Sequence, residues 1–135
     1  MSSFPDVLPM LIERIRAMPN PPLVVDLLPT DFTARLPIVH VTSGGGVEGY
    51  IDRVVRLNVD VYAGFPPAAG EESAEVLAGR VHDWLVPGGG VDSDFFACGA
   101  LADKVVCDPT PTLVPYPFDE VALVSAAYHV TVRRQ

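Results

Sequence analysis

The segment from Arg53 to Ala63 alternates between apolar and mostly polar residues, and this alternation limits the possible folds more than any other feature of the sequence. Successive side chains of a β-strand point to opposite faces of the sheet, so the two sets would lie on different faces. One face would carry Val55, Leu57, Val59 and Val61, and the other Val54, Arg56, Asn58, Asp60 and Tyr62. The sequence therefore predicts a sheet with one aliphatic face that other elements must cover.

Two segments have the periodicity of helices that can supply this cover. The first runs from Phe4 to Met18, has apolar residues at Val7, Leu8, Leu11, Ile12 and Ile15, and is followed by prolines that prevent its continuation. The second runs from Glu71 to Leu85, places Ala74, Leu77, Ala78, Val81, Trp84 and Leu85 on one face, and ends at Pro87 and three glycines. We therefore expect two amphipathic helices.

Further strands are predicted where short apolar runs lie between prolines and glycines. These runs are Leu23 to Leu28, Pro37 to Thr42, one or two strands within Asp94 to Cys107, and a closing strand within Val121 to Val132. A length of 135 residues is typical of a single domain. We therefore expect one α+β domain over residues 1–135, in which two helices pack on one face of a mainly antiparallel, twisted sheet.

The charge balance is acidic and argues against several classes of partner. Lys and Arg total 9 and Asp and Glu total 17, so the net charge is 9 − 17 = −8. Nucleic acids and anionic membranes are both bound through cationic side chains, so neither partner is expected. Met1 to Asp6 lacks the basic start of a secretory signal, and no apolar run approaches the length of about 20 residues that a membrane-spanning helix needs. We expect a protein that folds in the cytosol.

The sequence contains no recognisable motif for catalysis, a metal or a cofactor. His40, His82 and His129 are spread over a strand, a helix and a strand, without the H-E-x-x-H spacing of a zinc site. Two triple-glycine segments, Gly44 to Gly46 and Gly88 to Gly90, lack the Lys-Ser/Thr ending of a phosphate-binding loop, and we interpret both as flexible connectors. We therefore predict no metal, no cofactor and no enzymatic activity.

The paired carboxylates and the two cysteines have ordinary explanations. The pairs Asp92 with Asp94 and Asp119 with Glu120 occur where loops normally expose solvated charge. Cys98 and Cys107 form no C-x-x-C pair, and we interpret both as reduced packing residues. A disulfide between the two cysteines stays open at this point.

Several features follow one another along the chain in a characteristic order. A helix is followed by the segment Arg35 to Val41, a glycine-rich loop, the strand ending in Val59 to Ala63, a second helix, and a closing strand that includes Tyr128 to Val132. This order resembles that of the tail terminator proteins of long-tailed bacteriophages over most of the chain. The segment from Asp94 to Phe118 departs from the family through its many prolines and its two cysteines.

The resemblance implies a structural protein that acts by contact. Such a protein forms a six-membered ring on the completed tail tube, stops the addition of tube protein and presents a surface to the head-side connector or stopper protein. It would assemble in the bacterial cytoplasm and remain in the neck of the virion. One alternative is another neck protein, such as a head-closure protein or a head-to-tail adaptor. An alternative of a different class is a small enzyme or ligand-binding domain with an unrecognised site.

Two sets of residues are candidates for the contacts between subunits. The polar strand face offers Arg56, Asn58, Asp60 and Tyr62, which the aliphatic core does not use. The segment from Ser43 to Gly49 is longer than a two-residue hairpin requires, and it offers Gly44, Gly45, Gly46 and Val47. We expect this segment to be a mobile loop that becomes ordered only in the ring, and we expect its shortening to leave the core unchanged.

Overall fold

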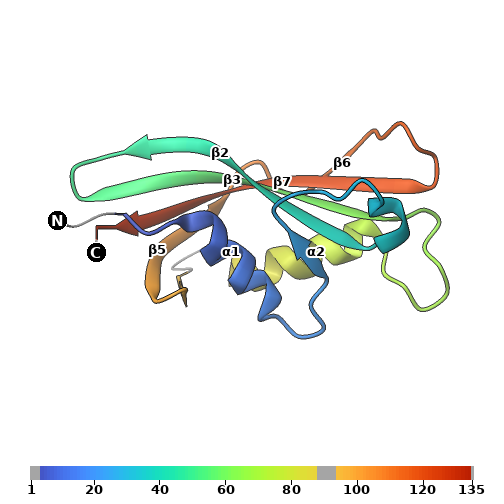
Figure 1. Cartoon of the computed structure of the whole chain (residues 1–135), viewed down its shortest axis with the longest axis horizontal. Coiled ribbons are helices and arrows are strands. Elements are labelled where there is room, and N and C mark those ends of the chain that lie inside the picture. The colour runs from blue at the N-terminus through green and yellow to red at the C-terminus, as the bar shows by residue number, and fades with distance from the viewer. Residues whose placement is uncertain (1–3, 88–93, 135) are drawn as a thin grey trace.

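The computed structural model describes residues 4–87 and 94–134 and shows two helices packed on one face of a curled, mostly antiparallel sheet (Figure 1). The α+β architecture predicted from the sequence is confirmed. The helices are α1 (Val7–Arg16) and α2 (Ala74–Leu85), with a short 3₁₀ helix at Phe32–Arg35. The strands are β1 (Leu23–Val25), β2 (Ile38–Glu48), β3 (Asp52–Gly64), β4 (Phe95–Ala97), β5 (Ala100–Cys107), β6 (Thr112–Val114) and β7 (Val121–Arg133).

The sheet is built around the antiparallel pair of β3 and β7. These strands pair from Asp52 opposite Arg133 to Gly64 opposite Val121, a span of about 40 Å at the usual rise of a strand. The strand order is β1-β2-β3-β7-β5-β4, and among the described strands only the pairing of β1 with β2 is parallel. The outer edge of β7 is shared, because β5 pairs with its C-terminal half and β6 with its N-terminal half. This long central pair gives the molecule two distant ends.

The predicted aliphatic face of β3 is the core of the protein. Val55, Leu57, Val59 and Val61 are all buried, and the apolar faces of α1 and α2 cover them. The two helices are also joined directly, because the indole Nε1 of Trp84 donates to the carbonyl of Arg14 at 2.7 Å. The Arg14 guanidinium lies 4.1 Å from the centre of the Trp84 ring, a cation–π contact. The periodicity of the sequence therefore identified the covered face correctly.

Helix α2 begins later than the sequence indicated. Ser73 caps the helix, since its Oγ accepts a hydrogen bond from the backbone N–H of Val76 at 3.2 Å. Glu71 and Glu72 therefore lie outside the helix instead of in its first turn. The Glu72 carboxylate instead binds Arg80, with 2.7 Å between Oε1 and Nη2, and Arg80 also donates to the carbonyls of Pro19 and Asn20. This arginine links the start of α2 to the segment after α1.

The glycine-rich segment of β2 is not the mobile loop that we expected. Gly44, Gly45 and Gly46 belong to β2, where a β-bulge places Gly44 and Gly45 opposite the single residue Arg56. Gly45 has φ +87°, a conformation that side chains with a Cβ rarely adopt, and a Cβ on Gly46 would lie 1.9 Å from the carbonyl oxygen of Val54. The turn itself is shorter and lies beyond Glu48. Gly45 suits the backbone of the bulge and Gly46 allows close strand pairing, so the prediction of a flexible connector was wrong.

The second half of the chain contains one strand that the sequence did not reveal. The proline-rich segment after Cys107 forms β6, which the prolines had obscured. Phe95–Ala97 and Ala100–Cys107 form the predicted short strands, joined by a two-residue turn in which Cys98 and Gly99 both have positive φ. Because β5 separates the two cysteines by about 25 Å, a disulfide between them is excluded.

The two cysteines differ in exposure. Cys98 is exposed at the hairpin turn, so the prediction that it is a packing residue was wrong, whereas Cys107 is partly buried against the core. The triple glycine Gly88 to Gly90 and the carboxylate of Asp92 lie outside the described residues. Within residues 4–87 and 94–134, no helix is long and apolar enough to cross a membrane.

Candidate functional site

The face of the sheet opposite the helices carries a polar band across its three central strands. In cross-strand rows, Asp60 of β3 lies between His40 and Ser125, and Asn58 lies between Thr42 and Ala127. Arg56, one row further along β3, is opposite His129 of β7. A shallow hollow of about 270 Å³ lies over this band and is lined by Thr42, Arg56, Asn58, Asp60, Pro109, Ser125, Ala126 and Ala127. The structure thus brings three of the predicted residues, Arg56, Asn58 and Asp60, together on an open surface.

Tyr62, the fourth predicted residue of this face, lies apart from the band. It is only 8% exposed, because Phe32 and Tyr116 pack against it edge to face, with ring centroids at 5.4 and 5.6 Å. These side chains belong to a second hydrophobic cluster with Ile38, Val121 and Leu123. Burial, then Asp60 and Tyr116, raise the pKa of the Tyr62 phenol. Tyr62 therefore closes a small core on this face, and its ring is not available to a partner.

The row of His40, Asp60 and Ser125 contains the residue types of a hydrolytic triad, but their order is different. In a triad the histidine lies between the serine and the acid, whereas here the Ser125 hydroxyl donates directly to the Asp60 carboxylate. The Nε2 of His40 lies 3.3 Å from the carbonyl oxygen of Asp26, the residue after β1. Strand β1 lies on the opposite side of β2 from β3 and Asp60. A carboxylate in this place orients the hydroxyl, and the imidazole is not positioned to accept the serine proton.

Residues of β7 complete the band, although they were not predicted as contact residues. Ser125 and His129 occupy alternate positions of β7 on the same face as Asp60 and Arg56. His129 is fixed by a contact of 3.0 Å between its Nε2 and the carbonyl oxygen of Asp108. The signal was present in the sequence, because Leu123, Ser125, Ala127, His129 and Thr131 form one alternating set of β7.

The glycine-rich candidates lie between the polar band and the turn of the β2–β3 hairpin. A Cβ on Gly44 would lie 3.1 Å from Asn58 Nδ2 and 3.5 Å from the Arg56 side chain, so this glycine borders the band. Val47 lies near the turn and is 73% exposed, and the turn itself exposes Tyr50 by 92% and Ile51 by 63%. We call Val47, Tyr50 and Ile51 the hairpin tip. Only Val47 of these three was predicted to contact a partner.

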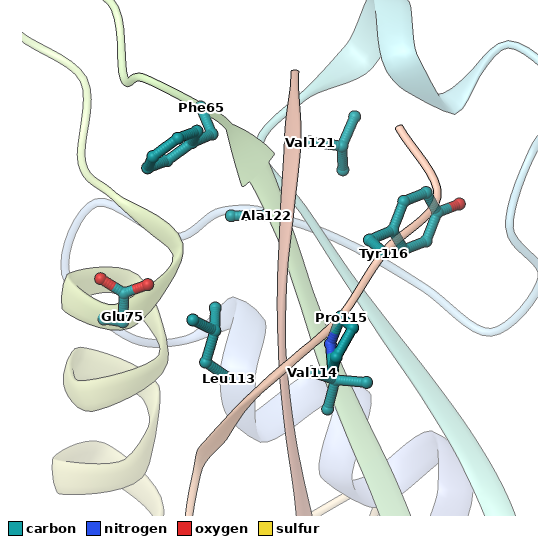
Figure 2. A pocket seen from close by; sticks show the side chains of 8 residues that line it. All are labelled: Phe65, Glu75, Leu113, Val114, Pro115, Tyr116, Val121 and Ala122. Carbon is teal, nitrogen blue, oxygen red and sulfur yellow. The ribbon is translucent and has the colours of Figure 1, made fainter. Parts of the chain in front are cut away.

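A groove lies at the opposite end of the β3–β7 pair (Figure 2). Its side chains come from the end of β3, from α2, from β6 and the segment after it, and from the start of β7. They are Phe65, Glu75, Leu113, Val114, Pro115, Tyr116, Val121 and Ala122, and we call this site the apolar groove. Phe65 and Leu113 are 60% and 58% exposed, so large apolar surfaces meet solvent here. The sequence did not predict this site, because it depends on the unexpected strand β6.

The apolar groove is a weak candidate for a small-molecule site. Its volume is about 290 Å³, just below the range of about 300–1,000 Å³ for ligand pockets. Specific ligand sites also contain several converging polar groups, and here the polar side chains are only Glu75 and Tyr116. The arrangement is better suited to receiving apolar side chains of another protein.

A cluster of ionisable groups around the buried Tyr128 connects α2 to the sheet. The Tyr128 hydroxyl is 3.0 Å from Nδ1 of His82, and Tyr128 is 1% exposed. Burial, and then the neighbouring Cys107, raise the pKa of the Tyr128 phenol well above its ordinary value. Burial likewise raises the pKa of the Cys107 thiol. Both shifts hold these groups in their neutral forms, which suits hydrogen bonding within the fold.

Residues 4–87 and 94–134 contain no group of three or more His, Cys, Asp or Glu side chains that could hold a metal ion. Comparison with known protein families and with curated proteins finds no match to this chain. The surfaces described above must therefore support any functional conclusion by their own chemistry.

Proposed function

We propose that this chain is a structural subunit of a bacteriophage virion that caps the completed tail tube, as a hexameric ring, and joins the tail to the head-side connector. The proposal rests on the resemblance of the chain to tail terminator proteins. The observation that carries it is the open surface of the β2–β3–β7 region, with its polar band and its exposed hairpin tip. Its partners would be further copies of itself, tail tube protein and a connector or stopper protein.

The chemistry of the open surface favours contact between proteins. Arg56, Asn58 and Asp60 offer a cation, an amide and a carboxylate within three cross-strand rows, which is suited to specific hydrogen bonds across an interface. The hairpin tip adds large apolar side chains, which contribute most of the affinity in many interfaces. We propose that the protein works without a catalytic step, a cofactor, nucleic acid or a membrane, in the neck of the particle.

Deletion of the gene from the phage that encodes it tests this function. Loss of a terminator leaves tube growth unchecked, so we expect electron microscopy to show abnormally long tails without heads. Plasmid-borne wild-type protein should restore normal tails. Tails of normal length together with empty heads would contradict termination and would favour the alternative of a head-closure protein or adaptor.

A binding assay tests the same proposal with purified components. We expect the protein to bind one end of isolated tail tubes and to block their further elongation by added tube protein. Size measurements with and without tubes then show whether ring formation requires the tube as a template. Lack of binding to tubes in either state would contradict the proposed function.

A further inference from the structure

We propose that the hairpin tip of one copy inserts into the apolar groove of the next copy, so that the chain associates head to tail. The inference rests on the proposed self-assembly and names the two surfaces that would meet. Each surface exposes apolar side chains that water does not favour, which are Val47, Tyr50 and Ile51 on the tip and Phe65 and Leu113 at the groove.

The positions of the two surfaces require that the contact joins different molecules. The tip lies at the end of β2 and in the turn before Asp52, whereas Phe65 follows the last residue of β3, so the length of that strand separates them. That length is about 40 Å, and Figure 1 shows the turn of the β2–β3 hairpin and the start of β7 at opposite ends of the molecule. A contact between two different surfaces of identical chains is heterologous, and it produces a ring where the rotation closes.

The tip is held in shape before it meets a partner. The backbone N–H of Gly49 donates to the carbonyl of Asp52 at 2.7 Å and closes the turn. Arg134 binds the same turn twice, since its Nε donates to the carbonyl of Tyr50 at 3.1 Å and its backbone N–H to that of Ile51 at 3.4 Å. A preformed tip loses less conformational entropy on binding than a flexible loop would.

The groove end is acidic, whereas the tip end carries balanced charges. Glu71, Glu75, Asp119 and Glu120 lie at the groove end and are all exposed. The tip end carries Arg53, Arg133 and Arg134 beside Glu48, Asp52 and Asp103, which pairs with Arg133 at 2.9 Å, a local balance of 3 − 3 = 0. In a chain with a net charge of −8, this difference favours contact of the tip of one copy with the groove of the next over contact between two grooves.

The size of the contact explains why a ring is needed. Three tip side chains bury much less than the roughly 800 Å² per partner of a stable interface. A single tip–groove contact is therefore weak, whereas each copy in a closed ring makes two such contacts and gains from the high effective concentration of its neighbours.

A disulfide trap tests the contact even when it is weak. Both chains carry Cys98→Ser and Cys107→Ala; one also carries Tyr50→Cys, and its affinity-tagged partner carries Leu113→Cys. We expect the oxidised mixture to give about tenfold more tagged–untagged dimer than a matched mixture of Tyr50→Cys with Leu27→Cys, because the contact raises the effective concentration of the two thiols. Leu27 is a suitable control, since it is 80% exposed and outside both surfaces. Equal yields from the two mixtures would overturn the proposal.

A chain that carries both Tyr50→Cys and Leu113→Cys sharpens the test. A head-to-tail contact leaves one tip and one groove unused at the ends of every open oligomer, so this chain should form a ladder of linked species. A product that stops at dimers would indicate a symmetric contact and would also overturn the proposal.

The phage assay separates this inference from the proposed function. We expect Tyr50→Asp and Leu113→Asp to keep the melting temperature of the wild type and yet to fail to restore normal tail length, whereas Leu27→Asp restores it. Restoration by all three variants would overturn the tip–groove contact and leave termination intact. Formation of the tagged–untagged disulfide dimer, together with tails of normal length in the gene deletion, would contradict the proposed function and still support the tip–groove contact.

Discussion

The middle of strand β3 and the hairpin tip before it differ in whether the chain covers their large apolar side chains. In the middle of β3, Val55 to Val61 lies beneath α1 and α2, so the chain supplies both the apolar face and its cover. At the hairpin tip, the large side chains of Tyr50 and Ile51 are exposed and have no cover within the described residues. The apolar side chains of the covered region are buried within a single molecule. Those of the hairpin tip are expected to be buried by another molecule. Substitutions in the two regions should therefore differ in what they affect.

The largest loss of stability is expected from Leu77→Ala in the covered region. Leu77 is 1% exposed on the buried face of α2, and its truncation leaves a cavity that costs about 2–5 kcal/mol. Trp84→Ala should fall in the same range, since it removes packing and the bond to the Arg14 carbonyl. Urea denaturation measures both changes, with the exposed Glu75→Ala as the control. A similar loss for Glu75→Ala would contradict the assignment of the buried face.

A smaller and more local loss is expected from Gly46→Ala in the hairpin. The added Cβ would lie 1.9 Å from the Val54 carbonyl oxygen, so the strands must separate there, at a cost of about 1–3 kcal/mol. Hydrogen exchange should show faster exchange of the β2–β3 amides beyond the bulge while the amides under the helices keep their protection. Gly44→Ala is the matched control, because its Cβ would meet only flexible side chains. Unchanged exchange in Gly46→Ala would show that the close pairing is absent in solution.

The contrast between the two regions also explains which structural features could be predicted from the sequence and which could not. The buried positions of Leu57 and Leu77 were predicted correctly. Each belongs to a regular spacing of apolar residues, and the element that covers this apolar face lies within the same chain. Gly46 was misplaced, since a triple glycine favours a loop by composition and only the approach of Val54 reveals its role in the strand. The apolar groove was missed because Leu113 follows several prolines and its strand is defined only by pairing with β7. Tertiary contacts of this kind leave no local signal.

A loss of about 1 kcal/mol is expected from Tyr128→Phe, which removes the hydroxyl beside His82. The effect should depend on pH in the alkaline range. Because burial raises the pKa of the folded Tyr128 phenol, its neutral form stabilises the fold fully below about pH 10, the pKa of an unfolded tyrosine, and stability falls as the pH rises above that value. Denaturation series at pH 8 and pH 11 should show a smaller alkaline loss for Tyr128→Phe than for the wild type. Equal alkaline losses would contradict a buried neutral phenol.

The smallest change in stability is expected from Arg56→Ala on the polar band. Arg56 is exposed on the open face, so its removal should change the free energy of unfolding by less than about 0.5 kcal/mol.

Arg56→Ala should affect assembly much more than it affects stability, because we propose that the polar band is a contact surface. A guanidinium at an interface contributes directional hydrogen bonds, and its loss commonly costs 10-fold or more in affinity, or about 1.4 kcal/mol. Binding of the purified variant to tail tubes, at protein concentrations near the midpoint for the wild type, measures this loss. Arg35→Ala provides the control, because Arg35 is an exposed arginine whose ion pair with Asp31 lies outside the band. Equal binding by both variants would remove the polar band from the contact surface, and the hairpin tip would then be the remaining candidate on this side of the sheet.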